Sequence, residues 1–326
     1  MPRTPNTRPI TLKQEPSAAS FAELCAEFIR FKKLRNLSPE TISFYEDCGR
    51  YFADFLGEAV MCDKITEDTY YNYIEHLHET KPNLSSATER SYLTGIRAIL
   101  YYGMKKGYLQ DFVVQLPKID EVVKDTYTDS EVKILLEKPD IKSASFAEYR
   151  NWVIINYMLG TGNRAGTIVS VQIEDLDFEG NIIILKKLKG RKQYVIPISR
   201  SLAAILREYL SYRKGEPGEP LFCTAYGKPM TTDILEKEIA RYNRKRGVEK
   251  TSLHMFRHTF AKQWILNGGD IFRLQKILGH SSLEMVRKYV NMFSDDLQRG
   301  FDSFNPLENY LGAANKGDKL SLKGRK

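Results

Sequence analysis

Residues 251–290 constrain this chain most, because they combine a helix–turn–helix pattern with most of its reactive side chains. Ser252 is a suitable helix N-cap, an apolar pattern follows it, and Gly268-Gly269 supplies the end of the helix. His254 and Arg257 stand three positions apart, so they share a face in the first turns. Free backbone N–H groups and the helix dipole favour an anion at that end of a helix.

A second helix is predicted from Ile271 to Leu278, where a glycine ends it and leaves His280 in a tight turn. A capping box formed by Ser281 and Glu284 then restarts a helix that carries Tyr289. The whole stretch therefore predicts a phosphate site made of two histidines and an arginine, with a tyrosine close behind it.

Charge gives the same indication for the whole chain. The formal net charge of +8 and the pI of about 9.1 indicate a polyanionic partner, and nucleic acid before a membrane. Basic residues cluster in 186–192, in 241–246 and in the tail that begins at Lys316. One charge run is usually a solvated face, but three runs in the second part of the chain favour double-stranded DNA as the partner.

The cysteine pattern and the hydropathy indicate the cellular compartment. The cysteines form no CxxC pair and predict reduced thiols, not a disulfide framework or a zinc site; they are Cys25, Cys48, Cys62 and Cys223. No apolar run approaches the roughly 20 residues that span a membrane. The N-terminus also lacks the apolar core of a signal peptide. We expect a cytoplasmic protein associated with the nucleoid, without a membrane contact.

The N-terminal part is predicted to be a helical bundle. Phe21, Leu24, Cys25 and Phe28 follow the spacing of one buried helical stripe. Further helix starts are predicted at Ser38-Pro39, at Thr66 and at a capping box of Ser86 with Glu89.

The segment 117–125 is the best boundary, although an ordinary inter-helix loop is an equally good interpretation of it. We expect a flexible leader at 1–18, a helical domain at 19–118, a linker at 119–126, a second domain at 127–312 and a basic tail at 313–326.

The second domain is predicted to mix helices with a few strands. Thr128 and Glu131 form a capping box, and a longer helix around 149–159 ends in Gly160-Thr161-Gly162. Residues 181–185 and 193–197 read as two strands joined by a turn, and 221–223 could add a third. The expected fold class is mainly α with a small antiparallel β-sheet.

Cleavage of a DNA phosphodiester needs a nucleophile, cations against the charge on the non-bridging oxygens, and an acid for the leaving oxygen. Arg164 and Arg257 suit the second role, because a guanidinium can hold two phosphate oxygens at once. A tyrosine nucleophile would conserve the bond energy in a phosphotyrosine ester, so resealing would need no ATP, and the chain has no Walker A sequence. Tyrosine is only about one part in a thousand ionised at pH 7, so His254, His280 or the arginines would have to assist Tyr289.

The ordered pattern TGNR…LKGRK…HMFRH…LGHSS…Y resembles the tyrosine recombinase (phage integrase) family, including its Xer-type members. The resemblance implies a metal-independent and cofactor-free site-specific recombinase that uses a 3′-phosphotyrosine intermediate. It assigns Tyr289 as nucleophile, Lys189 as general acid, and Arg164, His254, Arg257 and His280 as the phosphate-binding set. The chain departs from the family at Thr167, where an acidic residue is common.

The resemblance also has consequences for partners. It implies that 19–118 is a core-binding domain, that the DNA carries specific core sites, and that a homotetramer forms on two duplexes, with room for an accessory protein. An apolar series after Tyr289 would be the docking helix of such a tetramer, although packing on its own domain stays open. The series consists of Leu297, Phe301, Phe304, Leu307 and Tyr310.

The sequence is also compatible with other functions. A type IB topoisomerase-like enzyme would use similar chemistry without pairing two DNA sites. A non-catalytic DNA-binding protein, or a metal-dependent nuclease using Glu174, Asp175 and Asp177, belongs to a different class. His254 and His258 have the spacing of zinc ligands, but they lack the glutamate of HExxH and an evident third ligand.

Overall fold

Serine and threonine N-caps determine where the helices of the N-terminal unit begin. The computed structural model describes residues 19–57, 60–118, 125–185 and 194–279, and the chain forms two compact units, Met1–Val122 and Val123–Lys326. In the first unit, the caps Ser20, Ser38, Thr66 and Ser85 each accept a hydrogen bond from the backbone N–H three residues later. The helices that they begin are α1 (Phe21–Leu34), α2 (Pro39–Leu56), α3 (Glu67–Thr80) and α4 (Ser86–Lys106).

The predicted stripe of α1 is confirmed, because Phe21, Leu24 and Phe28 are buried in the core of this unit. The predicted capping box of Ser86 and Glu89 is wrong by one residue. Ser85 is the last extended residue and accepts from the Thr88 N–H at 3.2 Å. Glu89 instead lies 3.0 Å from Nε2 of His78 on α3.

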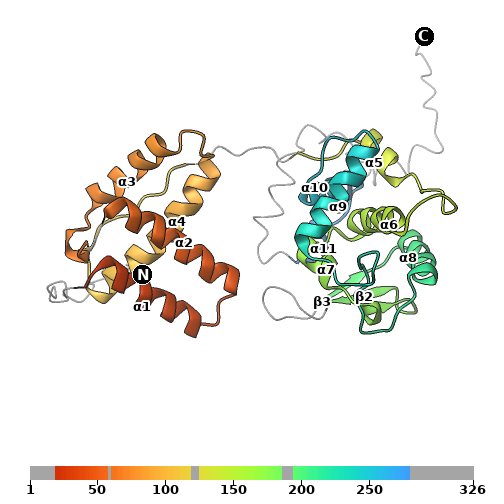
Figure 1. Cartoon of the computed structure of the whole chain (residues 1–326), viewed down its shortest axis with the longest axis horizontal. Helices are drawn as coiled ribbons and strands as arrows, with labels where there is room; N and C mark the ends of the chain where they lie inside the picture. Colours follow the sequence, from red (N-terminus) through yellow and green to blue (C-terminus); the bar gives the residue numbers. More distant parts are fainter. Residues whose placement is uncertain (1–18, 58–59, 119–124, 186–193, 280–326) are drawn as a thin grey trace, which may run out of the picture. The chain divides into compact units, whose positions relative to one another are not determined.

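The second unit is built around α6 (Phe146–Thr161), which is buried on nearly all sides. It packs against α5 (Asp129–Leu136), α8 (Arg200–Arg213), α9 (Thr232–Lys245) and α10 (Leu253–Leu266). Figure 1 shows α6 between α8 and the pair α9 and α10. The remaining α-helices described are α7 (Ala165–Ser170) and α11 (Ile271–Leu278), so the predicted helix 271–278 is confirmed at both ends.

A small antiparallel sheet closes one side of this core. Its order is β1-β2-β3, with β1 at Leu176–Asp177, β2 at Ile182–Leu185 and β3 at Tyr194–Pro197. Ile183 pairs with Ile196, and both side chains are buried. The two predicted strands and the mainly α fold class are thus confirmed.

The predicted third strand at 221–223 is wrong. Cys223 forms only an isolated bridge with Pro229, while β1 supplies the third strand from a segment for which no strand was predicted. The side chain of Asp175 accepts from the Gln172 N–H at 2.9 Å and closes a short 3-10 turn. That turn delivers Leu176 into register with Ile183.

The cysteines are free thiols, as predicted. Among the helices in the described ranges, none has the length and apolar character needed to cross a bilayer.

Candidate active site

Three distant segments meet at one main-chain oxygen. The carbonyl of Leu278, at the end of α11, accepts from Nη2 of Arg257 at 2.8 Å and from Nη1 of Arg164 at 3.3 Å. Arg257 also donates through Nη1 to the carbonyl of Gly162 at 2.7 Å. Two of the predicted phosphate-binding residues are therefore side by side, although about ninety positions separate them in the sequence.

Gly162 makes this convergence sterically feasible. It ends α6 in the left-handed conformation, with φ of 64°, and its N–H donates to the carbonyl of Met158. A Cβ at this position would lie 2.5 Å from Phe260 of α10 and 2.8 Å from Leu278 of α11. Only a glycine lets the end of α6 approach both helices so closely.

The two arginines differ in exposure. Arg257 is 4% exposed, whereas Arg164 is exposed and caps the N-terminus of α7. Two permanent positive charges that share one neutral carbonyl repel each other, and an anion lying against both relieves this repulsion. A guanidinium pair of this kind suits the two non-bridging oxygens of a phosphodiester.

His254 lies on the exposed side of the first turn of α10. Its ring centroid is 6.4 Å from that of His258, with the planes 25° apart. Within the described ranges, no group of three or more His, Cys, Asp or Glu side chains is placed to hold a metal ion.

Two of the three acidic residues considered for a metal-dependent nuclease, Asp175 and Asp177, have structural tasks in this unit. Asp175 is buried and holds the Gln172 N–H, and Asp177 accepts from the N–H groups of Glu179 and Gly180. These contacts close the turns on either side of β1, which accounts for Asp175 and Asp177 without a catalytic role.

Lys189, His280 and Tyr289 lie outside the described residues, so the structure places three of the six predicted site residues. Thr167, where the family commonly has an acid, is buried in the first turn of α7, and its N–H donates to the carbonyl of Arg164 at 2.9 Å.

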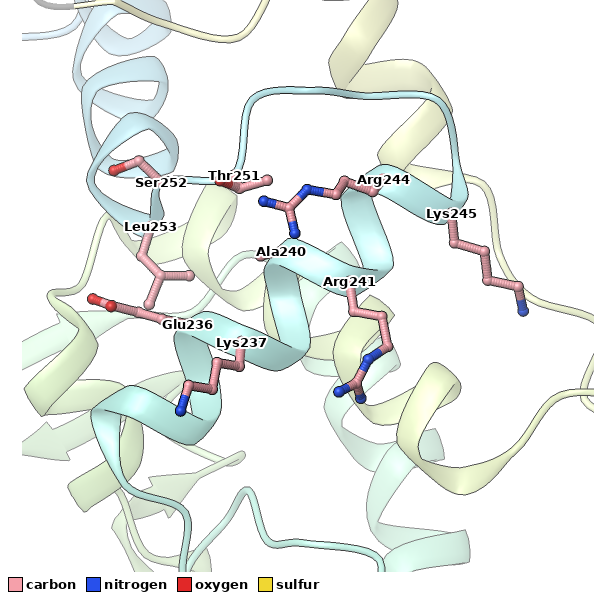
Figure 2. A pocket seen from close by; sticks show the side chains of 9 residues that line it. All are labelled: Glu236, Lys237, Ala240, Arg241, Arg244, Lys245, Thr251, Ser252 and Leu253. Atoms are coloured by element: carbon pink, nitrogen blue, oxygen red, sulfur yellow. The ribbon is translucent and has the colours of Figure 1, made fainter.

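A groove with a basic lining lies between α9 and the start of α10. Figure 2 shows its lining, in which the Arg244 side chain extends from α9 toward Thr251. The residues that line it are Glu236, Lys237, Ala240, Arg241, Arg244, Lys245, Thr251, Ser252 and Leu253. Lys237 and Arg244 form no ion pair within the part of the chain that the structure describes.

The basic run 241–246 was predicted from the sequence, and Lys237 was not. The signal was present, because 237, 241 and 244 have the spacing of one helical face. Glu236 is the one acidic residue among those that line the groove, so basic side chains outnumber acidic ones there.

Buried contacts hold α9 in this orientation. Arg150 of α6 is 2% exposed and donates to Oε2 of Glu238 at 2.9 Å, to Asn151 and to the carbonyl of Cys223. Glu238 also accepts from Arg241 at 2.6 Å. Because a buried charge without a partner is costly, this pair fixes which face of α9 is turned outward.

Comparisons with known proteins identify the family of both units. The profile of the phage integrase family matches residues 126–295, and that of the phage integrase SAM-like domain matches 20–119. Tyrosine recombinase XerD of Staphylococcus aureus (strain Mu50 / ATCC 700699) is 25% identical over 292 residues, which cover 86% of this chain and 97% of that protein.

Solved structures share the fold. A Tn1549 transposon integrase in complex with circular intermediate DNA matches with a TM-score of 0.68 and 22% identity, covering 83% of this chain and 94% of that one. XerH recombinase bound to its palindromic difH substrate matches with a TM-score of 0.65 and 22% identity, covering 91% of this chain and 85% of that one. A lambda integrase dimer on a COC′ core site gives a TM-score of 0.67 at 14% identity, covering 94% and 81%.

Proposed function

The chain belongs to the phage integrase family, and on that premise we propose that Tyr289 cuts DNA by forming a covalent 3′-phosphotyrosine ester. The protein is a site-specific recombinase, an enzyme that cleaves and rejoins DNA. One observation supports this proposal for the site. The main-chain carbonyl of Leu278 accepts hydrogen bonds from both Arg164 and Arg257, and Leu278 is two residues before His280 in the sequence.

The reaction that we propose balances without ATP or a metal. The Tyr289 hydroxyl attacks phosphorus, the bond from phosphorus to the 5′ oxygen breaks, and a 3′-phosphotyrosine ester forms. Lys189 gives its proton to the leaving 5′ oxygen, while His254 or His280 takes the proton of the phenol. Arg164 and Arg257 hold the non-bridging oxygens, where negative charge increases in the transition state. Attack by a 5′ hydroxyl of the second duplex then reverses these steps and completes the exchange.

DNA is the partner, and we propose that the groove beside α9 contacts its backbone. Support comes from Lys237 and Arg244, which lie beside the N-terminal turn of α10 that carries His254. Contacts with phosphate position a protein on a duplex, and base contacts add specificity.

The domain roles are part of the same proposal. Residues 19–118 serve as the core-type DNA-binding domain, 119–126 as the linker and 127–312 as the catalytic domain. The leader 1–18 and the basic tail 313–326 lie outside the two domains.

The assembly is also part of the proposal. The protein works in the cytoplasm on nucleoid DNA, as a homotetramer on two paired sites. In this tetramer, the segment around 297–310 docks on a neighbouring subunit. Deletion after Phe293 should leave DNA binding and weaken pairing of the two sites, and unchanged recombination would refute this docking.

A nicked duplex that releases the cut end as a short fragment tests the catalytic proposal. Its core site would be selected from genomic DNA by binding to the purified protein. The native protein should form a covalent adduct in the presence of EDTA, and Tyr289→Phe should form none. Tyr226→Phe is the matched control, because Tyr226 is 90% exposed on a turn and should not be needed. EDTA-sensitive cutting without an adduct would refute the proposal, and so would an adduct that survives in Tyr289→Phe.

A further inference from the structure

A buried tyrosine holds the catalytic helix from behind. The N–H of Tyr127 donates to Oγ1 of Thr259 at 2.9 Å, and its ring lies against Phe256 with centroids 4.3 Å apart. The one hydrogen of its hydroxyl is shared between the carbonyls of Lys250, at 3.2 Å, and Ser252, at 3.5 Å. One residue thus contacts α10 at its N-cap and at two successive turns.

These contacts lie on the side of α10 away from the proposed site. Phe256 and Thr259 are three residues apart, so they share one face of the helix. At about 100° per residue, His254 and Arg257 lie about 100° to 160° around the helix from Phe256 and Thr259. Tyr127 is therefore placed to set the rotation and position of α10 without touching DNA.

A second side chain completes the support. Asn243 of α9 is 0% exposed, and its Nδ2 donates to the Lys250 carbonyl at 2.7 Å and to the Tyr127 hydroxyl at 3.0 Å. The side chain of Ser252 makes no capping hydrogen bond, so these contacts take over the task of fixing the entry into α10. Burial raises the pKa of the Tyr127 hydroxyl, which therefore stays protonated and able to donate.

We propose that Tyr127 is a positioning residue for strand cleavage, acting through α10 on His254 and Arg257. The inference rests on the proposed function, because it needs both residues to act on the scissile phosphate. Displacements of about 1 Å at a catalytic group can cost a factor of 10² in rate. Loss of the hydroxyl should therefore impair the chemical step and spare DNA binding.

Tyr127→Phe tests this, because it keeps the ring against Phe256 and removes only the hydroxyl. We expect the single-turnover rate of adduct formation on the nicked duplex to fall about tenfold, well within the range of a small displacement. The dissociation constant for the duplex should stay within about twofold, because Tyr127 does not reach the groove. Amide hydrogen exchange should increase in the first turns of α10 and stay unchanged in α8.

The matched control is Tyr242→Phe. Tyr242 is 4% exposed in the same unit, and its hydroxyl donates to the carbonyl of Leu135 at 3.3 Å. This variant loses one buried tyrosine hydrogen bond that does not involve α10, so its cleavage rate should stay within about twofold of native.

The possible results separate the two proposals. A native protein that forms no adduct with Tyr289 refutes the proposed function. A native adduct with cleavage by Tyr127→Phe within twofold of native refutes only this inference. An equal loss of rate in Tyr242→Phe, or unchanged exchange in α10, also refutes it.

Discussion

At the scale of single residues, the main-chain carbonyl of Leu278 links the two arginines of the proposed site. It accepts from both Arg164 and Arg257, and it is a main-chain atom. The link is therefore independent of the side chain at 278 and depends on the path of the chain. Anything that moves the end of α11 should change the spacing of the two guanidinium groups.

Gly162→Ala is expected to destabilise the protein by about 3 kcal/mol, from overpacking and from the left-handed conformation. The new methyl group would displace Phe260 or Leu278, so cleavage should fall as well. Gly166→Ala is the control, because nothing lies within 4 Å of its Cβ and a helical alanine is worth up to about 1 kcal/mol over glycine. Denaturant unfolding measures both variants, and equal effects would contradict this account.

Arg257→Lys keeps the charge and removes the fork that spans two carbonyls. We expect cleavage to fall by about 10²- to 10³-fold, the typical result of losing one transition-state donor. The measurement is single-turnover adduct formation. Arg207→Lys is the control, since Arg207 also donates to a backbone carbonyl, that of Phe178, but away from the site. A rate near native for Arg257→Lys would exclude a direct role for its guanidinium.

Sequence reasoning predicted these arginines as neighbours but not their shared acceptor. Residue types at family spacing identify Arg164 and Arg257, because each motif requires that side chain. A hydrogen bond to a main-chain oxygen leaves no such signature, since every residue supplies a carbonyl. For the same reason, the contacts of Tyr127 with Lys250 and Ser252 could be found only in the structure.

At the scale of elements, local signals predicted helices better than strands. The capping box of Thr128 and Glu131 begins α5, and Gly279 ends α11 in the left-handed conformation. These signals are local and complete within one turn. Strand β1 has only two residues, and it exists because of its partner Ile183, so no local pattern could announce it.

The face of α9 gives a prediction at this scale. Lys237→Gln and Arg244→Gln should each weaken DNA binding and lower the slope of log K against log salt by about 0.9, the value for one released phosphate contact. Cleavage at saturating protein should change less than affinity. Binding titrations across a range of salt concentrations measure the slope.

The control for α9 is Lys142→Gln, because Lys142 is an exposed lysine in a turn of the same unit and does not line the groove. It should leave the slope unchanged. If this variant lowers the slope as much as Arg244→Gln does, the groove is not the DNA contact.

At the scale of the whole molecule, the cysteines report on the two units separately. Cys25, Cys48 and Cys62 belong to the first unit and Cys223 to the second. Burial raises the pKa of the Cys48 thiol to about 12 and that of Cys62 to about 11. At pH 8 roughly one thiol in a thousand or fewer is then ionised, so alkylation of the folded protein should be slow and should speed up as pH rises toward these values.

Pulsed alkylation across a denaturant series, read by peptide mass spectrometry, should therefore give one midpoint for each unit. Gly162→Ala should lower the Cys223 midpoint and leave those of Cys48 and Cys62 in place, because the substitution lies in the second unit. A common shift at all of the cysteines would show that the two units unfold together.

The fold class of the molecule could be predicted from the sequence, and the contacts that support α10 could not. Periodicity predicted a mainly α chain with a small sheet, which the structure confirms. Motif order predicted a recombinase-type second half, which the family match confirms. The residue that supports α10 from behind was not foreseen, because Tyr127 comes right before a capping box and reads as an ordinary apolar position.

Residues 125–127 also open the described part of the second unit, and they contact α10, which carries His254 and Arg257. Nζ of Lys250 donates to the carbonyl of Thr126 at 3.0 Å, next to the contacts of Tyr127. A displacement of residues 125–127 would therefore be passed to the start of α10 through direct hydrogen bonds. The path of the chain at Asp125 is thus one determinant of where α10 begins.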